Sequence, residues 1–364
     1  MMQFSPLNGN GAKAKSRVLF VDDQKRFFTR MDRNYRYKYE RMRKLLEPDS
    51  FTTVDISAVS SDLDPSLYAI LLVGVFALFP LRTDPPEWAV PPPWFHQINT
   101  CCAMVEDLWP PRGSHSLAEF LGNKYQYLIS TYDCDDLAQL CKRLPSVRKA
   151  YVIPHHIDIE LYKDRGLPKI YDVLFYGNTN PERYPFRDRL RRLLASSRLK
   201  VRIIEHPGAH VFDEERCSEA LARIINQSEI SIATPSIGDY LVAKYFEISA
   251  AGSVVAGKMA NQGRQIWKEH YVQLEEDMSD LEILGRLTAA LKDKDSLRYK
   301  REVMGKFVRQ EYSLDRYIER FTAVLQDMSA SETSLNENET FRHEKANSGL
   351  QISYQNQCMC QRQP

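Results

Sequence analysis

Short runs of apolar residues alternate along this chain with longer stretches in which apolar residues recur at helical spacing. Uninterrupted runs at 17–21 and 171–177 predict buried strands, because strands covered on both faces show no polar alternation. Between such runs, Phe186, Leu190 and Leu194 share one face of a predicted helix. Further strands are predicted at 51–56, 68–75, 103–109, 127–130, 151–154, 200–205, 230–233, 253–256 and 271–274, and helices at 24–46, 137–141, 217–226, 264–269, 280–291, 297–311 and from 313. This alternation predicts an α/β fold of parallel sheets with helices on both faces.

Changes in composition divide the chain into four parts. Residues 1–15 are polar and glycine-rich and predict a flexible leader. Two α/β domains are predicted at 16–160 and 161–328, joined by a linker that begins near Tyr162. Residues 329–364 are rich in Ser, Asn, Glu and Gln without periodicity, which predicts a disordered tail.

The overall composition is that of a folded globular protein. Hydrophobic residues make up 43% and charged residues 27% of 364 residues, enough for two domains. A net charge of +1 gives no bias toward polyanions, so no nucleic-acid partner is expected. The longest uncharged apolar run, 67–81, is too short to span a bilayer, so no transmembrane segment is expected. Seven cysteines without a Cys-x-x-Cys pair predict free thiols in the cytoplasm.

The segment 234–257 contains the pair of carboxylates that most suggests a ligand site. Asp239 is predicted to cap a helix, and Glu247 lies eight residues further along it. A helix turns about 100° per residue, so the two acids would lie roughly 80° apart and two turns apart. They could hold two hydroxyl clusters of one elongated ligand. The alternative is that Asp239 only caps the helix and Glu247 only pairs with Lys244.

A second candidate site follows the strand at 171–177. This strand ends in Gly177, and a loop beginning with Asn178 leads to a helix predicted from Pro185. Arg183 and Arg187 crowd the positive end of that helix, where cations are disfavoured by roughly 0.3–1 kcal/mol each. A bound anion such as phosphate would reverse this cost. A solvent-facing arginine cluster is the alternative.

Three other features contain residue types that can bind metal ions or ligands. Asp133 to Asp136 contains an Asp-x-Asp, which helix capping explains without a metal ion. The adjacent His155 and His156 diverge, so no metal site is expected. The proline-rich loop at 80–95 carries Trp94, which would line an acceptor-side cleft or pack on the surface.

Several of these motifs, in their order, resemble the GT-B glycosyltransferases. Retaining members that use nucleotide sugars carry Glu, seven residues, a second Glu and a small-residue helix end, and Asp239…Glu247…Ala251-Gly252 follows this pattern with Asp in first place. The turn ending in Asp158 and the strand–glycine–loop–helix at 171–187 are similar to two further GT-B features. The motifs at 175–183 and 244–247 are most similar to the CgeB-type, spore-maturation-protein-like glycosyltransferases.

This resemblance implies two Rossmann-like domains whose parallel sheets face each other across a cleft. It implies that Asp239 contacts the donor sugar, Glu247 holds the ribose and Arg183 stabilises the departing diphosphate. The candidate catalytic residues are Asp239 and Arg183, and the donor-binding residues are Gly177, Asn178, Arg183, Arg187, His206, Lys244 and Glu247. His156 and Trp94 are candidates on the acceptor side.

The expected function is transfer of a sugar from a nucleotide-diphosphate sugar to a glycan, protein or small-molecule acceptor. The resemblance implies that no metal ion or other cofactor is bound. One alternative is an inactive GT-B protein that binds a nucleotide or glycan as a scaffold, favoured by the shortened first acid and by Asn178 in place of a cation. Another is a different chemistry on the same fold, such as nucleotide-sugar epimerisation.

Overall fold

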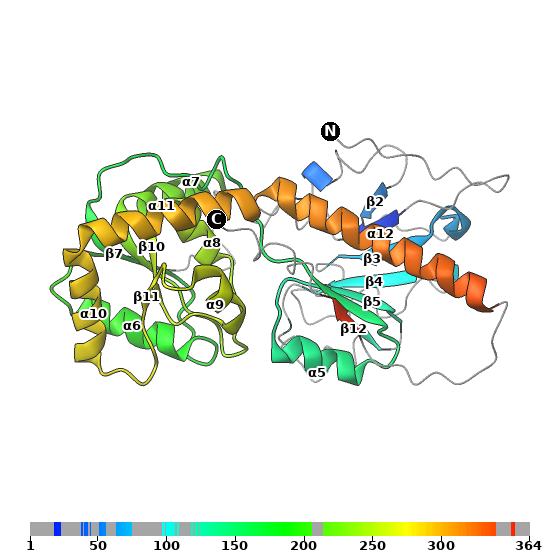
Figure 1. Cartoon of the computed structure of the whole chain (residues 1–364), viewed down its shortest axis with the longest axis horizontal. Coiled ribbons are helices and arrows are strands. Elements are labelled where there is room, and N and C mark those ends of the chain that lie inside the picture. Colours follow the sequence, from blue (N-terminus) through cyan, green and yellow to red (C-terminus); the bar gives the residue numbers. More distant parts are fainter. Residues whose placement is uncertain are drawn as a thin grey trace.

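Two α/β lobes follow each other along the chain (Figure 1). The computed structural model describes residues 18–22, 38, 40–42, 44, 51–55, 63–74, 97–98, 100–105, 108, 118, 121–122, 124–205, 214–339 and 351–353. Each lobe is built on one sheet whose paired strands all run parallel. The α/β class predicted from the sequence is therefore confirmed.

The N-terminal sheet has seven strands in the order β12-β6-β5-β4-β3-β1-β2. They are β1 (Val18–Asp22), β2 (Phe51–Asp55), β3 (Ile70–Val73), β4 (Thr100–Val105), β5 (Tyr127–Ser130), β6 (Lys149–Val152) and β12 (Gln351–Ser353). The chain moves outward from β1 to β2 and returns on the other side at β3. The direction of winding therefore changes between β1 and β3.

Helices cover both faces of this sheet, which explains its uninterrupted apolar strands. Leu19 and Val21 pack toward α5 (Asp135–Arg143), while Phe20 packs toward α12 (Leu314–Glu339). Successive side chains of a strand point to opposite faces, so one apolar run supplies both layers. Figure 1 shows α12 leaving the C-terminal lobe and crossing the N-terminal sheet. Leu314, Tyr317 and Phe321 of α12 belong to the core of the N-terminal lobe, so the last helix returns to that lobe.

The C-terminal sheet has the strand order β11-β10-β9-β7-β8. Its strands are β7 (Tyr171–Gly177), β8 (Val201–Glu205), β9 (Ser228–Ile232), β10 (Val254–Gly257) and β11 (Val272–Gln273), and its helices are α6 (Pro185–Ala195), α7 (Glu214–Asn226), α8 (Lys244–Ala250), α9 (Asn261–Trp267), α10 (Asp280–Lys292) and α11 (Lys294–Glu311). Leu190 of α6 and Leu287 of α10 pack on one face, and Ile225 of α7 and Ile248 of α8 pack on the other. Winding changes direction between β7 and β9.

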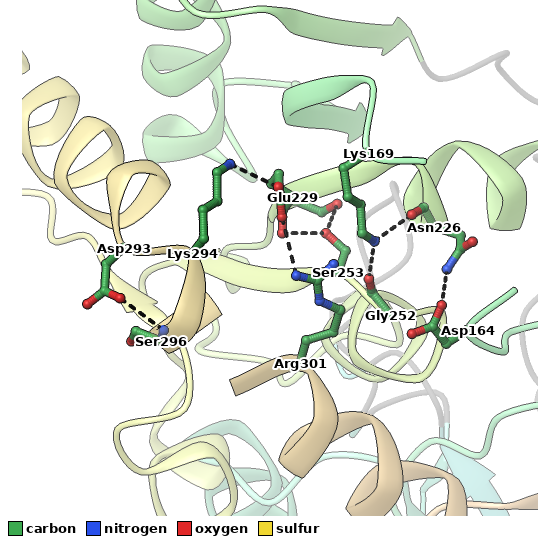
Figure 2. A network of polar contacts seen from close by, with 11 residues as sticks. Asp164, Lys169, Asn226, Glu229, Gly252, Ser253, Asp293, Lys294, Ser296 and Arg301 are labelled. Carbon is green, nitrogen blue, oxygen red and sulfur yellow. Dashed lines mark hydrogen bonds and ion pairs between the residues drawn. The ribbon is translucent and has the colours of Figure 1, made fainter. Parts of the chain in front are cut away.

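A polar network fixes the segment between the lobes to the C-terminal lobe (Figure 2). Lys169 donates to the carbonyl oxygens of Asn226 and Gly252, each at 2.5 Å, at the C-terminal ends of α7 and α8. The Asn226 amide donates to Asp164 Oδ1 and Ala251 O, each at 2.8 Å. A cation at two helix C-termini is favourable, so this contact holds both helices to the linker.

The structure corrects several predicted boundaries. The strand predicted at 103–109 is Thr100–Val105, because apolar side chains fill the strand from Cys101 on. Cys134, not an aspartate, is the N-cap residue of α5, and no side chain caps that helix. The predicted disordered tail is wrong in part, because α12 continues to Glu339 and Gln351–Ser353 pairs with β6.

Candidate functional site

The described candidate donor-site residues gather where β7 and β9 end. In open parallel sheets, ligands bind beyond the carboxyl ends of the strands, at the point where winding changes direction. Gly177 ends β7 with a φ of 96°, and Thr234 follows β9. A Cβ at Gly177 would lie 2.5 Å from the Lys244 Nζ atom. Only glycine therefore suits this position.

Arg187 is a buried cation that joins the two loops at this point. Its Nε donates to Thr234 Oγ1 at 3.1 Å, its Nη2 to Thr234 O at 2.6 Å and its Nη1 to Asn178 O at 3.2 Å. The guanidinium lies 3.9 Å from the centre of the Tyr184 ring. Burial lowers the pKa of Arg187. Arg187 lies in the first turn of α6, as predicted from the sequence, and its guanidinium reaches across to Thr234 in the loop after β9.

Lys244 is a second buried cation beside Arg187. Its ammonium donates to the carbonyl oxygen of Tyr176 and lies 4.2 Å from the centre of the Tyr176 ring. Its pKa is lowered well below the ordinary value, first by burial and then by the charge of Arg187, while Glu247 acts in the opposite direction. Burial and the neighbouring guanidinium therefore both favour the neutral amine of Lys244.

Glu247 provides a carboxylate next to these cations. The Tyr176 hydroxyl donates to Glu247 Oε2 at 3.1 Å, and both side chains are buried. The charge of Glu247 raises the pKa of Lys244, and Glu247 also has a second partner in the Tyr176 hydroxyl. Two buried basic side chains, Arg187 and Lys244, stand beside one carboxylate, and an anionic ligand would favour the protonated form of Lys244.

The structure places Asp239 outside the helix, which corrects the sequence analysis. Helix α8 begins at Lys244, and Asp239 has a left-handed backbone with φ of 58°. The predicted angle of about 80° between the two acids therefore does not apply. The Asp239 carboxylate accepts from the Asn261 N–H at 2.8 Å, at the start of α9, so it serves a different helix from the one it was predicted to cap. Burial raises the pKa of Asp239, and the Asn261 N–H and the nearby Lys258 and Arg264 oppose this effect.

The loop from Asn178 to Arg183 lies beside the Asp239 loop. Asn178 is exposed, and its Oδ1 accepts from the Asn180 N–H at 2.8 Å. Arg183 is partly exposed, and its carbonyl oxygen accepts from the Ile237 N–H at 3.0 Å. Arg183 and the Asp239 loop are thus brought together by a backbone contact.

The same Asp239 loop contacts the N-terminal lobe. Tyr240 stacks on Tyr132 with ring centres 4.5 Å apart, and its hydroxyl donates to Asp136 Oδ2 at 2.6 Å. Tyr132 lies after β5, so the carboxyl edges of the two sheets meet here. His155 Nε2 lies 3.3 Å from the Tyr132 hydroxyl, and burial lowers the pKa of His155 to about 3. His155 is therefore neutral at physiological pH.

His156, a candidate on the acceptor side, lies away from this cluster and beside α12. His156 is buried with its ring centre 5.2 Å from that of Tyr317 on α12. Trp94 and His206 lie outside the described residues. Within the described ranges, no group of three or more His, Cys, Asp or Glu side chains could hold a metal ion. No helix of the described residues is long and apolar enough to cross a membrane.

Sequence reasoning missed two residues that organise the cluster, Tyr176 and Thr234. Tyr176 is the second-last residue of β7, and Thr234 is the second residue after β9. The available signal was that each residue lies at the end of a predicted strand. Only the strand order shows that these two strand ends are neighbours at the switch point.

Solved structures with the same architecture cover nearly the whole chain. HepE from Anabaena in complex with UDP-glucose is similar with a TM-score of 0.56 at 13% identity, covering 85% of this chain and 99% of that chain. Sucrose-phosphate synthase from Thermosynechococcus elongatus has a TM-score of 0.55 at 10% identity, covering 87% and 100%. The T4 phage BGT mutant in complex with UDP-glucose has a TM-score of 0.54 at 11% identity, covering 85% and 99%.

No family model and no curated protein matches the sequence itself. At 10 to 13% identity, the likeness to solved structures concerns the fold alone. The chain therefore has the GT-B fold, with two parallel-sheet α/β domains in one polypeptide.

Proposed function

We propose that this chain is a glycosyltransferase that moves a sugar from a nucleotide-diphosphate sugar to an acceptor hydroxyl, without a bound metal ion. The observation that carries the proposal is the buried pair of Arg187 and Lys244 beside Glu247, at the switch point of the C-terminal sheet. A buried arginine beside a lysine that can take up a proton favours an anionic ligand. UDP-glucose bound to HepE and to the T4 phage BGT mutant, which share the fold, is consistent with such a ligand.

In this proposal, residues 161–328 bind the donor and residues 16–160 bind the acceptor. The bond between the anomeric carbon and the diphosphate oxygen breaks, and its electron pair leaves with the diphosphate. Lys244, Arg183 and the N-terminus of α6 stabilise that charge, while Arg187 holds the two loops around it. The acceptor oxygen forms the new bond to the anomeric carbon, and its proton passes to the released diphosphate. Glu247 holds the ribose and Asp239 contacts the sugar, as the GT-B resemblance implies.

The finer assignments belong to the same proposal. The motifs at 175–183 and 244–247 favour the CgeB type of glycosyltransferase, acting in the cytoplasm on a glycan, protein or small-molecule acceptor. Metal independence is tested by adding EDTA to the assay, since Lys244 and Arg183 are proposed to supply the positive charge that a metal ion would otherwise supply.

The experiment is to incubate the protein with UDP-, GDP- and ADP-sugars and to measure the free nucleoside diphosphate released. The Asp239→Ala/Glu247→Ala variant should lose this release. A matched control, Asp295→Ala/Glu319→Ala, removes two exposed acids that pair with arginines on α11 and α12 and should retain it. Release from no donor, together with no donor-dependent rise in melting temperature, would overturn the proposal.

A scaffold that binds without turnover is the second candidate. One oxygen of the Asp239 carboxylate is already bonded to the N–H of Asn261, which favours a structural role for this acid. Under this candidate the donor raises the melting temperature but no nucleoside diphosphate is released.

A further inference from the structure

The strand β12 occupies the outer edge of the N-terminal sheet. It pairs in parallel with β6, with Gln351 opposite Lys149 and Ser353 opposite Tyr151. Among the described strands, no other pairs with this side of β6. An edge strand presents backbone N–H and C=O groups that accept a further strand. If β12 left its place, β6 would present such an edge.

The pairing of β12 is short, and this makes the strand replaceable. It spans three residues, so its ladder holds few hydrogen bonds, and each contributes little net free energy. Ordering an extended segment costs conformational entropy at every residue. A longer extended segment forms more of these bonds with the same edge, so it can compete with β12 for β6.

The edge of β6 is held in place by contacts other than those of β12. The whole of β6 pairs with β5 on its inner side. The Tyr151 hydroxyl donates to Asp327 Oδ2 of α12 at 2.5 Å, and Lys149 Nζ donates to the same oxygen at 2.7 Å. A segment that replaces β12 therefore meets a preformed edge and does not have to order β6.

The parallel direction of β12 leads toward the candidate site. Past its last strand residue, the chain of β6 continues to His155, whose Nε2 lies 3.3 Å from the Tyr132 hydroxyl. Tyr132 stacks on Tyr240 of the C-terminal lobe, where the two lobes meet. Strands lie about 4.8 Å apart and rise about 3.3 Å per residue, so a segment in the place of β12 runs about 10 Å from β5. About three residues beyond the position of Ser353, such a segment is level with Tyr132.

We propose that the outer edge of β6 is a docking site for an extended polypeptide, that residues 351–353 occupy this site within the chain itself, and that the glycosyl acceptor is a hydroxyl group of a docked polypeptide. Main-chain hydrogen bonds supply the affinity of such an added strand. Parallel docking carries the residues that follow the docked segment to the site between the lobes. A hydroxyl oxygen there takes the place of the diphosphate oxygen at the anomeric carbon, and its proton passes to the released diphosphate. The acceptor role rests on the proposed function, whereas the docking site does not.

The test uses the full chain with its occupant weakened. The N–H groups of successive strand residues point to opposite sides, so Gln351→Pro/Ile352→Pro removes one that faces β6 whichever register is bonded. The control, Gln351→Thr/Ile352→Val, keeps both N–H groups and favours an extended backbone. The probe is a fluorescein-labelled peptide, Gly-Leu-Gln-Ile-Ser-Tyr-Gln-Asn, with the sequence of residues 349–356. A second peptide of this sequence, N-methylated at its Gln-Ile pair, cannot form the same ladder.

Fluorescence anisotropy measures docking. We expect the double-proline variant to bind the peptide about tenfold more tightly than the unsubstituted protein, because the tethered occupant competes at a high effective concentration. The control variant should match the unsubstituted protein, and the N-methylated peptide should not bind. Equal affinity of all three proteins, or no binding to the double-proline variant, would overturn the docking site. A double-proline variant that dimerises in size-exclusion chromatography and ignores the peptide would assign the edge to a second copy instead.

The acceptor role is measured with the same proteins. Each is incubated with UDP-, GDP- and ADP-sugars and with the peptide extended by a run of serines, and mass spectrometry detects a glycosyl residue added to the peptide. We expect faster addition by the double-proline variant than by the control variant. If the peptide docks and nucleoside diphosphate is released, but the peptide gains no sugar, the acceptor role is overturned and the proposed function stands. If no donor is bound or turned over, the proposed function fails together with the acceptor role, and anisotropy still decides the docking site.

Discussion

Lys244 offers the sharpest test of the buried charge imbalance. Burial and the charge of Arg187 lower its pKa well below the ordinary value, and Glu247 only partly opposes them. A diphosphate next to Lys244 adds negative charge and raises this pKa again. The complex therefore binds more protons than the free protein between the two pKa values. Nucleotide binding should take up protons, and affinity should fall as pH rises through this window.

The size of this effect is bounded by the number of protons. One group that is fully deprotonated in the free protein and fully protonated in the complex changes the affinity about tenfold per pH unit, or about 1.4 kcal/mol. The charged and titratable groups that face Lys244 are Arg187 from α6, Tyr176 from β7 and Glu247 from α8 itself. Arg187 stays protonated, and a tyrosine titrates only at high pH, so Lys244 is the group expected to change.

Calorimetry in two buffers measures the protons directly. UDP, GDP and ADP are titrated between pH 7.5 and 9, above the second phosphate pKa of about 6, so that the ligand itself changes little. The difference in heat between a phosphate and a Tris buffer gives the number of protons taken up. We expect a positive number, up to about one. Lys244→Met should bind more weakly, take up no protons and show affinity that is flat with pH.

Two results would refute this reasoning. Tight binding with a pH-independent affinity and no buffer-dependent heat would mean that Lys244 is a stable ammonium before the ligand arrives. Proton uptake that persists in Lys244→Met would assign the proton to another group.

Three further predictions concern the linker network and the turn after β7. Asn226→Ala should lower the free energy of unfolding, measured by urea denaturation, by about 2–4 kcal/mol. The buried amide donates to Asp164 and Ala251 O and accepts from the Leu167 N–H, and all three hydrogen bonds would be lost. A loss below about 1 kcal/mol would contradict this. Burial lowers the pKa of Lys169 from 10.5 to about 8, so the unfolded chain binds more protons than the folded protein between these pH values. The free energy of unfolding, relative to that of Lys169→Met, should therefore rise with pH across this window by at most about 1.4 kcal/mol per pH unit. A difference that is flat or falls with pH would refute the shift. Gly177→Ala should weaken nucleotide binding by more than threefold, because the added Cβ would displace the Lys244 ammonium. Gly166→Ala is the control, because this glycine is also left-handed but has open space around it, so the alanine adds only backbone strain of about 1–3 kcal/mol. Equal binding by both variants would contradict the proposed displacement.

The sequence predicted the strands that the winding of the chain brings to the site. The runs at 127–130 and 171–177 are the observed bounds of β5 and β7, and the helix after the glycine begins at Pro185 as predicted. These elements are long enough, apolar enough and clearly enough bounded for periodicity to identify them. The strand predicted at 103–109 missed the bounds of β4, because it began after Thr100 and ran on through Glu106 and Asp107.

The arrangement of the site required tertiary information. Asp239 was predicted to cap the following helix, because an aspartate after a Pro-Ser-Ile-Gly turn is a common cap. The loop instead continues to Ala243, because Tyr240 is drawn to Tyr132 and Asp136 of the other lobe. A contact with residues more than a hundred positions away leaves no mark in local periodicity.

The same limit explains why the contacts of Arg187 were not predicted. From the sequence alone, an arginine in the first turn of a helix is an isolated unfavourable cation. In the structure its guanidinium uses three nitrogens on Thr234 and Asn178, so it holds together two loops that only the strand order makes neighbours. Lys244 was singled out only through the resemblance of its segment to a donor site, and its contact with Tyr176 likewise depends on the tertiary fold. Arg187→Lys should disrupt the geometry of the two loops, and so should lower the free energy of unfolding more than Lys244→Met does. Both substitutions should weaken nucleotide binding.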